Sequence, residues 1–218
     1  RLGITVHPPD VMASGLHFTV EGEAIRFGLL AIKNVGEGAI ESIIAARADG
    51  PFRSLADLCA RVDLRLVNKR VLEALIKCGA MDALGHPAQL LLALDDAIAF
   101  GQAQQRDRVS GQVSLFDNLG ADEVVLERPL PNATPASSRE RLRWEKELMG
   151  LYLSDHPLGE LAAEIGKYCN AYSGDMGEEL DQQRIAIGGV VTGLRKVVTK
   201  SKATMAVATV EDLQGNIE

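Results

Sequence analysis

Apolar residues recur at two different spacings along the chain, and the change of spacing separates its regions. Over residues 4–27 they alternate with polar residues, which is typical of short strands joined by turns such as the one at Gly22. Over residues 29–108 and 138–168 they recur every three or four residues, which predicts helices. From Arg184 the alternation returns and predicts strands, with a third strand cut off just before the chain ends at Glu218.

Local signals predict where individual helices begin and end. The residues expected to cap or start a helix are small and polar or have the fixed φ of proline: Ser54, Asn68, Pro87 and Ser137. Glu140 follows Ser137 at the spacing of a capping box. Asp49-Gly50-Pro51 and Gly79 are expected to stop helices. Residues 109–137, rich in Gly, Pro, Asn and Ser, are predicted to form a loop.

Composition narrows the class of protein. Hydrophobic residues make up 46% of the 218 residues, which predicts a globular chain. The sequence has no run of eighteen apolar residues, so no membrane span is predicted. The three cysteines, Cys59, Cys78 and Cys169, are far apart, and no Cys-x-x-Cys occurs. We therefore expect a reduced, cytoplasmic protein without a structural metal. Because the sequence begins Arg1-Leu2-Gly3, without Met or a signal peptide, we expect a piece of a longer polypeptide.

The charge is distributed unevenly. The net charge of −7 argues against nucleic acid as a partner, but residues 53–77 carry a local excess of three positive charges. A second basic segment, residues 195–202, contains no acid and four basic residues: Arg195, Lys196, Lys200 and Lys202. Salt screening confines each patch to its own neighbourhood, so both are candidate phosphate-binding surfaces on an acidic protein.

The segment Leu30–Arg47 has the pattern of a helix-hairpin-helix module. Two predicted helices meet at Val35-Gly36-Glu37-Gly38, where glycines permit positive φ and let a phosphate approach the backbone. The following helix would point free N–H groups at that phosphate. Such a module binds the sugar-phosphate backbone of DNA without reading its sequence. The alternative is an ordinary tight turn between two packed helices.

Residues 54–79 are interpreted as a second, degenerate copy of this module. Asn68-Lys69-Arg70 opens a helix at the position that the hairpin has in the first copy, and the two basic side chains would replace the missing glycines. The alternative is a solvated helix face. Two phosphate contacts in tandem would form a duplex-binding unit whose candidate residues are Lys33, Asn34, Val35, Gly36, Glu37, Gly38, Asn68, Lys69 and Arg70.

The sequence predicts no catalytic residues. Nucleotidyl transfer needs carboxylates that hold two metal ions, and no Asp-x-Asp lies on a predicted strand. Asp95-Asp96 lie on a helix, where neighbours face different directions. Phosphate-loop, zinc-protease and serine-hydrolase motifs do not occur, and no metal site is predicted.

Three segments resemble the bacterial DNA polymerase III alpha subunit. They are Ile25–Gly38 (IRFGLLAIKNVGEG), Val67–Lys77 (VNKRVLEALIK) and Trp144–Leu153 (WEKELMGLYL), the last followed by His156-Pro157-Leu158. The resemblance covers nearly the whole chain in the same order, and only residues 120–136 and 168–183 match loosely.

The resemblance implies a mainly α fold with a partial β domain, a tandem helix-hairpin-helix followed by an incomplete OB-fold barrel. By this resemblance residues 1–28 end the fingers domain, and 29–108 are the tandem helix-hairpin-helix. Residues 109–137 form a loop, 138–183 are connecting helices, and 184–218 are the first strands of the OB-fold. A truncated barrel is expected to expose an unpaired edge. Arg195, Lys196, Lys200 and Lys202 are expected to face nucleic acid in this region.

One segment of the loop resembles a clamp-binding motif. In Ser110–Asp117 two large apolar residues interrupt a polar sequence, and the spacing Gln-x-x-Leu-Phe resembles the motif by which bacterial polymerases bind the sliding clamp. The candidate residues are Gln112, Ser114, Leu115 and Phe116. Leu115 and Phe116 would fill an apolar pocket of the clamp while Gln112 bonds at its rim. The alternative is that they pin the loop to the protein's own core.

The resemblance assigns the polymerase activity to a parent protein, a DNA-directed DNA polymerase, whose palm domain with its catalytic acids and Mg²⁺ would lie upstream. No cofactor is expected in this segment. The expected partners are primer-template duplex, single-stranded DNA at the OB-fold, the sliding clamp and other replicase subunits, but no membrane. Two alternatives stay open: a DNA-repair or scaffolding protein that uses the same hairpin module, and a tRNA-binding OB-fold protein.

Overall fold

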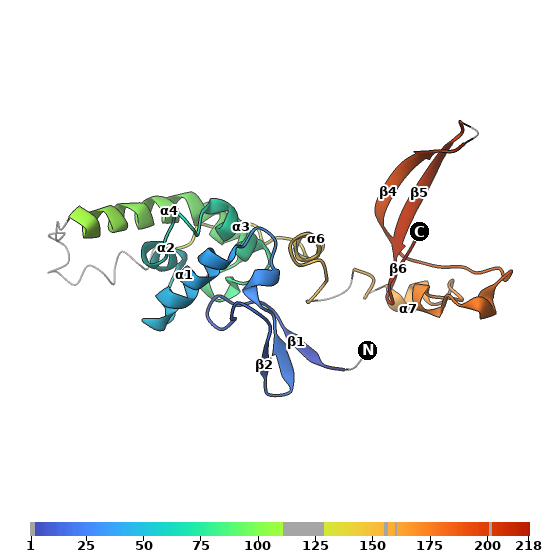
Figure 1. Ribbon diagram of the computed structural model, residues 1–218, viewed down its shortest axis with the longest axis horizontal. Helices are drawn as coiled ribbons and strands as arrows, with labels where there is room; N and C mark the ends of the chain where they lie inside the picture. Colours follow the sequence, from blue (N-terminus) through green and yellow to red (C-terminus); the bar gives the residue numbers. More distant parts are fainter. Residues whose placement is uncertain (1–2, 111–128, 155–156, 160, 201) are drawn as a thin grey trace. The chain divides into compact units, whose positions relative to one another are not determined.

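The chain divides into two compact units, residues 1–154 and 155–218 (Figure 1). The computed structural model describes residues 3–110, 129–154, 157–159, 161–200 and 202–218. The division falls inside the stretch predicted to connect two domains, residues 138–183. The fold class is confirmed, since the described residues form mainly helices together with two small sheets.

The first unit begins with a three-stranded sheet. Strands β1 (Thr5–His7), β2 (Thr19–Glu21) and β3 (Ala24–Arg26) have the order β1-β3-β2, in which β1 runs parallel and β2 antiparallel to β3. Gly22, with φ +62, makes the β2–β3 turn, as the sequence predicts. The expectation of short strands over residues 4–27 is confirmed.

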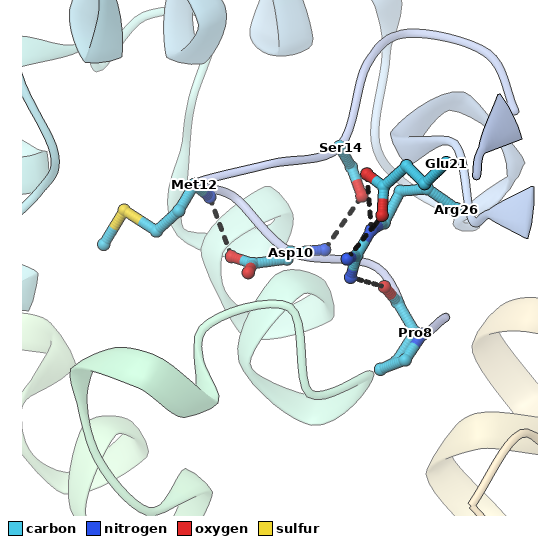
Figure 2. A network of polar contacts seen from close by, with 6 residues as sticks. All are labelled: Pro8, Asp10, Met12, Ser14, Glu21 and Arg26. Carbon is cyan, nitrogen blue, oxygen red and sulfur yellow. Dashed lines mark hydrogen bonds and ion pairs between the residues drawn. The ribbon is translucent and has the colours of Figure 1, made fainter. Parts of the chain in front are cut away.

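A polar network ties this sheet to the loop that follows β1 (Figure 2). Arg26 donates to both carboxylate oxygens of Glu21, at 2.8–3.1 Å, and to the carbonyl oxygen of Pro8 at 3.1 Å. In the same loop Asp10 accepts a hydrogen bond from the Met12 amide and donates its own amide to Ser14 Oγ. The loop then reaches the helices, because the Val11 amide donates to the Ala80 carbonyl at 2.9 Å.

The described residues that follow form five helices, and the predicted N-caps are confirmed. They are α1 (Glu37–Ala48), α2 (Leu55–Arg61), α3 (Lys69–Lys77), α4 (Pro87–Ser110) and α6 (Ser138–Met149), with short 3-10 turns η1 (Leu29–Ala31) and η2 (Asp82–Leu84). The side chains of Ser54, Asn68 and Ser137 accept hydrogen bonds from the third residue of their helices. Helix α4 extends two residues beyond the point where the apolar pattern ends.

The core of this unit lies where α4 packs against α2 and α3 (Figure 1). Most of its side chains are aliphatic, in line with the low aromatic content, and its fully buried members include Ile40, Ile43, Leu58, Leu72, Leu75, Leu90 and Leu94. Helix α6 joins the same core through Leu148, which is 6% exposed. Helix α6 therefore belongs to the first unit.

The second unit holds short helical turns and a three-stranded sheet. The turns are α7 (Ala162–Ile165), η4 (Ser173–Asp175) and η5 (Glu178–Leu180). Strands β4 (Val190–Val198), β5 (Thr204–Glu211) and β6 (Asn216–Ile217) follow one another as antiparallel neighbours, with an irregularity in β4 between Val191 and Gly193. Among the described residues these strands form an open sheet, which fits an incomplete barrel.

Two boundaries predicted in this unit are wrong. The strand begins at Val190 and not at Arg184, because the preceding segment bonds to a side chain: Asn170 donates to the Arg184 carbonyl and accepts from the Ala186 amide at 2.7 Å. The helix predicted to reach about Tyr168 ends at Ile165, before Gly166.

Candidate nucleic-acid interface

The first predicted phosphate-binding turn lies between η1 and α1. Gly36 is the N-cap of α1 and makes no side-chain capping bond, in contrast to the caps of α2 and α3. A Cβ atom on Gly36 would meet nothing within 4 Å, so the backbone is open to an approaching group. The exposed first amides of α1 are a candidate site for a phosphate oxygen.

The glycines of this turn have a role different from the predicted one. Gly36 has φ −89 and Gly38 lies within the helix, so neither residue uses positive φ. The left-handed residue is Asn34, with φ +69. Asparagine tolerates this conformation better than most residues do. Val35 is 5% exposed and belongs to the core, so its side chain points away from any ligand.

The second predicted contact begins at Asn68. Its side-chain oxygen accepts a hydrogen bond from the Val71 amide at 3.2 Å, so this residue caps α3. Lys69 forms an ion pair with Asp95 of α4, with 2.6 Å between Nζ and Oδ1, and this contact raises the pKa of Lys69. Arg70 is exposed, and among the described residues it has no recorded ion pair.

The structure brings the two predicted contacts close together. The loop before α3 packs on the first turns of α1, because the Asp63 amide donates to Ser42 Oγ at 2.8 Å. A Cβ atom on Gly38 would lie 3.7 Å from the Leu66 side chain. The N-termini of α1 and α3 therefore border the same loop, residues 63–67. Lys33, before α1, and Arg70, in the first turn of α3, are both exposed.

Two of the basic residues counted over residues 53–77 serve the fold. Arg61 donates to the carbonyls of Ala46 and Gly50 at the end of α1, and its guanidinium lies 4.8 Å from the Phe52 ring centre. Arg65 forms an ion pair with Asp63 at 2.7 Å, and its hydrogen bonds lower the pKa of Asp63 to about 2. The net excess of three positive charges is unchanged, because the partners Asp57 and Asp63 are acids that the count already includes, but fewer basic side chains are left unpaired.

The four basic residues of the β4–β5 hairpin do not share one face. Arg195 and Lys196 are neighbours on β4 and so point to opposite sides of the sheet. Arg195 forms an ion pair with Glu218 at 2.7 Å. Lys200 and Lys202 are exposed in the connecting turn, where Lys202 has φ +62. The clamp-binding candidates Gln112, Ser114, Leu115 and Phe116 lie outside the described residues.

The described residues show features that the sequence reasoning missed. A cavity of about 280 Å³ lies between Pro8–Asp10, the end of α3 and helix α6. Its charged lining is already paired: Arg141 binds Asp82 at 2.6 Å, and Glu145 accepts bonds from the loop after α6. The Arg141–Asp82 pair joins residues 59 positions apart, so no local signal predicts it.

The chemistry of the described residues gives no sign of a reactive centre. They contain no group of three or more His, Cys, Asp or Glu able to hold a metal ion. Burial raises the pKa of Cys59 and Cys78 to about 12, so both thiols stay protonated. Across the part of the chain that the structure describes, no helix has the length and apolar character needed to cross a membrane.

Comparison with known proteins explains this arrangement. A helix-hairpin-helix motif model matches residues 3–90, which include both turns. The whole chain is 37% identical to the DNA polymerase III subunit alpha of Haemophilus influenzae and of Escherichia coli, and 38% identical to that of Thermus aquaticus. The chain belongs to the DNA polymerase III subunit alpha family. It spans about a fifth of the length of these relatives, at 18–19%.

Membership of the DNA polymerase III alpha family confirms the resemblance and gives the paired turns a context. The helix-hairpin-helix match covers the three-stranded sheet and all elements up to the start of α4. Whether the individual residues bind phosphate, or form only a tight turn and a solvated helix face, is the question that the binding experiments proposed below address.

Proposed function

We propose that this chain is the part of a replicative DNA polymerase that holds duplex DNA through its phosphates. The observation that carries the proposal is the exposed, uncapped N-terminus of α1 beside that of α3, within the helix-hairpin-helix match. Partial positive charge at the first turn of α1 and the cations Lys33 and Arg70 suit two phosphates of one strand.

Nucleotidyl transfer, with its Mg²⁺ ions, is assigned in this proposal to other parts of the parent DNA-directed DNA polymerase. The contribution of this chain is to hold the duplex in place during DNA replication in the cytoplasm. Because phosphates are the target, binding is independent of sequence. It weakens steeply as the salt concentration rises, because salt cations compete with the protein's basic side chains for the phosphates.

Titration of labelled primed duplex, followed by fluorescence anisotropy at several salt concentrations, tests the proposal. We expect two unrelated sequences to bind equally and Arg70→Ala to reduce the slope of log K against log salt by about one unit. Arg139→Ala is the matched control, because Arg139 is an exposed arginine on α6. Affinity that does not change with the salt concentration, or an equal change of the salt slope in both variants, contradicts the proposal.

A second function is favoured by the sequence of residues 112–116. We propose that Gln112, Leu115 and Phe116 bind the sliding clamp, with Ser114 between them. The two adjacent apolar side chains in a polar segment support this proposal.

A further proposal is that the β4–β5 turn, with Lys200 and Lys202, contacts single-stranded DNA. The other replicase subunits remain expected partners of the parent protein.

A further inference from the structure

The hairpin turn is anchored by a helix that is distant in sequence. The amide of Lys33, the residue before left-handed Asn34, donates to the carbonyl oxygen of Leu148 at 2.9 Å. Leu148 lies in the last turn of α6 and is buried in the core. The turn therefore begins at a backbone contact with α6.

A single buried carboxylate organises the end of α6. Glu145 is 6% exposed and lies one helical turn before Leu148. Its Oε2 accepts hydrogen bonds from the amides of Leu153 and Ser154, at 2.9 and 3.2 Å, and its Oε1 accepts one from Ser154 Oγ at 2.7 Å. A buried carboxylate with three donors is held firmly, because each bond to a charged group is stronger than a neutral one.

These bonds fold the chain back onto its own helix. Gly150, with φ +79, ends α6, and its amide donates to the Lys146 carbonyl at 3.0 Å. The following loop returns to Glu145 and places Leu153 against the core. Hydrogen bonds at Glu145, before Leu148, and at Gly150, after it, thus hold the last turn of α6 in place. The Leu148 carbonyl is thereby kept in position to accept the Lys33 amide.

We propose that Glu145 is a positioning residue for the phosphate-binding turn Asn34–Gly38. It acts through the Leu148 carbonyl, which holds the Lys33 amide and so sets where the turn enters α1. This inference rests on the proposed duplex binding for its functional consequence. Its structural part, the link from Glu145 to Lys33, is measurable without DNA.

Amide hydrogen exchange of the full chain, measured by NMR on Glu145→Gln, tests the link. The amide of glutamine cannot accept all three bonds, so we expect the end of α6 to loosen and exchange at the Lys33 amide to rise about tenfold. The Asp63 amide, bonded to Ser42 Oγ, is the internal reference and keeps its rate. Glu147→Gln, an exposed glutamate on the same helix, is the matched control.

Duplex binding tests the functional consequence. Glu145→Gln should weaken binding by about five- to tenfold with an unchanged salt slope, because the phosphate contacts stay the same in number. Equal exchange rises at Lys33 and Asp63, or no rise at Lys33, overturns the link. A rise at Lys33 with unchanged affinity overturns the role in binding. If the wild type does not bind duplex, the proposed function fails, and the exchange result still decides the link.

A milder variant keeps the test available if Glu145→Gln does not fold. Ser154→Ala removes one donor and leaves both amide bonds to Glu145. A smaller rise in exchange at Lys33, about threefold, is then expected, since one of three hydrogen bonds is lost. No rise at Lys33 in this variant overturns the proposal.

Discussion

Gly101 of α4 lies so close to Cys59 of α2 that a Cβ atom on Gly101 would overlap the Cys59 carbonyl. Next to this contact, Gln105 Nε2 donates to the carbonyls of Cys59 and Val62, at 3.1 and 2.7 Å. Gln105 of α4 thus acts as a cap for the last carbonyls of α2. At Gly101 the two helices pack without a side chain of α4 between them.

Gly101→Ala is expected to lower the free energy of unfolding by about 1–3 kcal/mol, because the added methyl group overpacks the α2–α4 contact. In an open helix the same change would stabilise the protein by up to about 1 kcal/mol, so the sign identifies the contact. Urea unfolding followed by circular dichroism measures it. Gln102→Ala, at an exposed position of the same helix, should change the stability little.

Gly36→Val is expected to reduce duplex affinity about tenfold, equivalent to about 1.4 kcal/mol. The branched side chain would cover the first amides of α1. The fold should tolerate it, because Gly36 has φ −89 and a Cβ atom there meets nothing. Anisotropy and thermal unfolding together separate the two effects. A large drop in melting temperature, or unchanged affinity, would show that Gly36 is an ordinary turn residue.

The elements that the sequence predicts well are those with local causes. Ser54, Asn68 and Ser137 bond to amides three residues away, so their capping is visible in the sequence. The exposed turn at Gly36 is predicted for the same reason. Its conformation is not, because the left-handed φ belongs to Asn34, while both glycines have other conformations.

The features that escape sequence reasoning join distant residues. Arg61 counts as a surface charge in the sequence, but it binds the carbonyls of Ala46 and Gly50 because α2 packs at the end of α1. Lys69 meets Asp95 across 26 positions, and Lys33 meets Leu148 across more than a hundred. A count of charges therefore overestimates the surface available to phosphate.

Under the proposed function, Asp95 would compete with a DNA phosphate for the cation of Lys69. Asp95→Asn is expected to strengthen duplex binding by no more than about two- to threefold, since an ion pair between exposed side chains is weak. Asp96→Asn, which removes the same charge at the next position of α4, is the control and should have a smaller effect. Both variants are compared by anisotropy at low salt. Equal effects would mean that only the net charge matters.

Simultaneous replacement of Gln112, Leu115 and Phe116 by Ala is expected to abolish retention of the sliding clamp in a pull-down. Two apolar anchors contribute roughly 1.5–3 kcal/mol each, so their loss exceeds what a micromolar interaction tolerates. The melting temperature should stay nearly unchanged. An unfolded triple variant would instead show that Leu115 and Phe116 belong to the protein's own core, and normal retention would assign clamp binding elsewhere.

The second unit should depend on pH through Asp212. This carboxylate is 3% exposed. Burial by itself raises its pKa, but hydrogen bonds from Ser173, Gln214 and Gly215 outweigh burial and lower the pKa to about 2. Ser173 Oγ lies 2.6 Å from Oδ1, and the amides of Gln214 and Gly215 lie at 2.8 and 2.9 Å. These bonds hold the turn before β6 against η4.

A group with a lowered folded-state pKa stabilises the fold above its ordinary pKa, near 4 for aspartate, and loses this contribution as the pH falls towards about 2. We therefore expect amide-exchange protection at Ser173 and Gly215 to fall between about pH 4 and pH 2. In Asp212→Asn the protection should be low at neutral pH and change little over this range. Asp181→Asn is the control, since Asp181 is an exposed acid in the same unit and lies outside η4. Wild-type protection that stays constant down to pH 2 would contradict this role of Asp212.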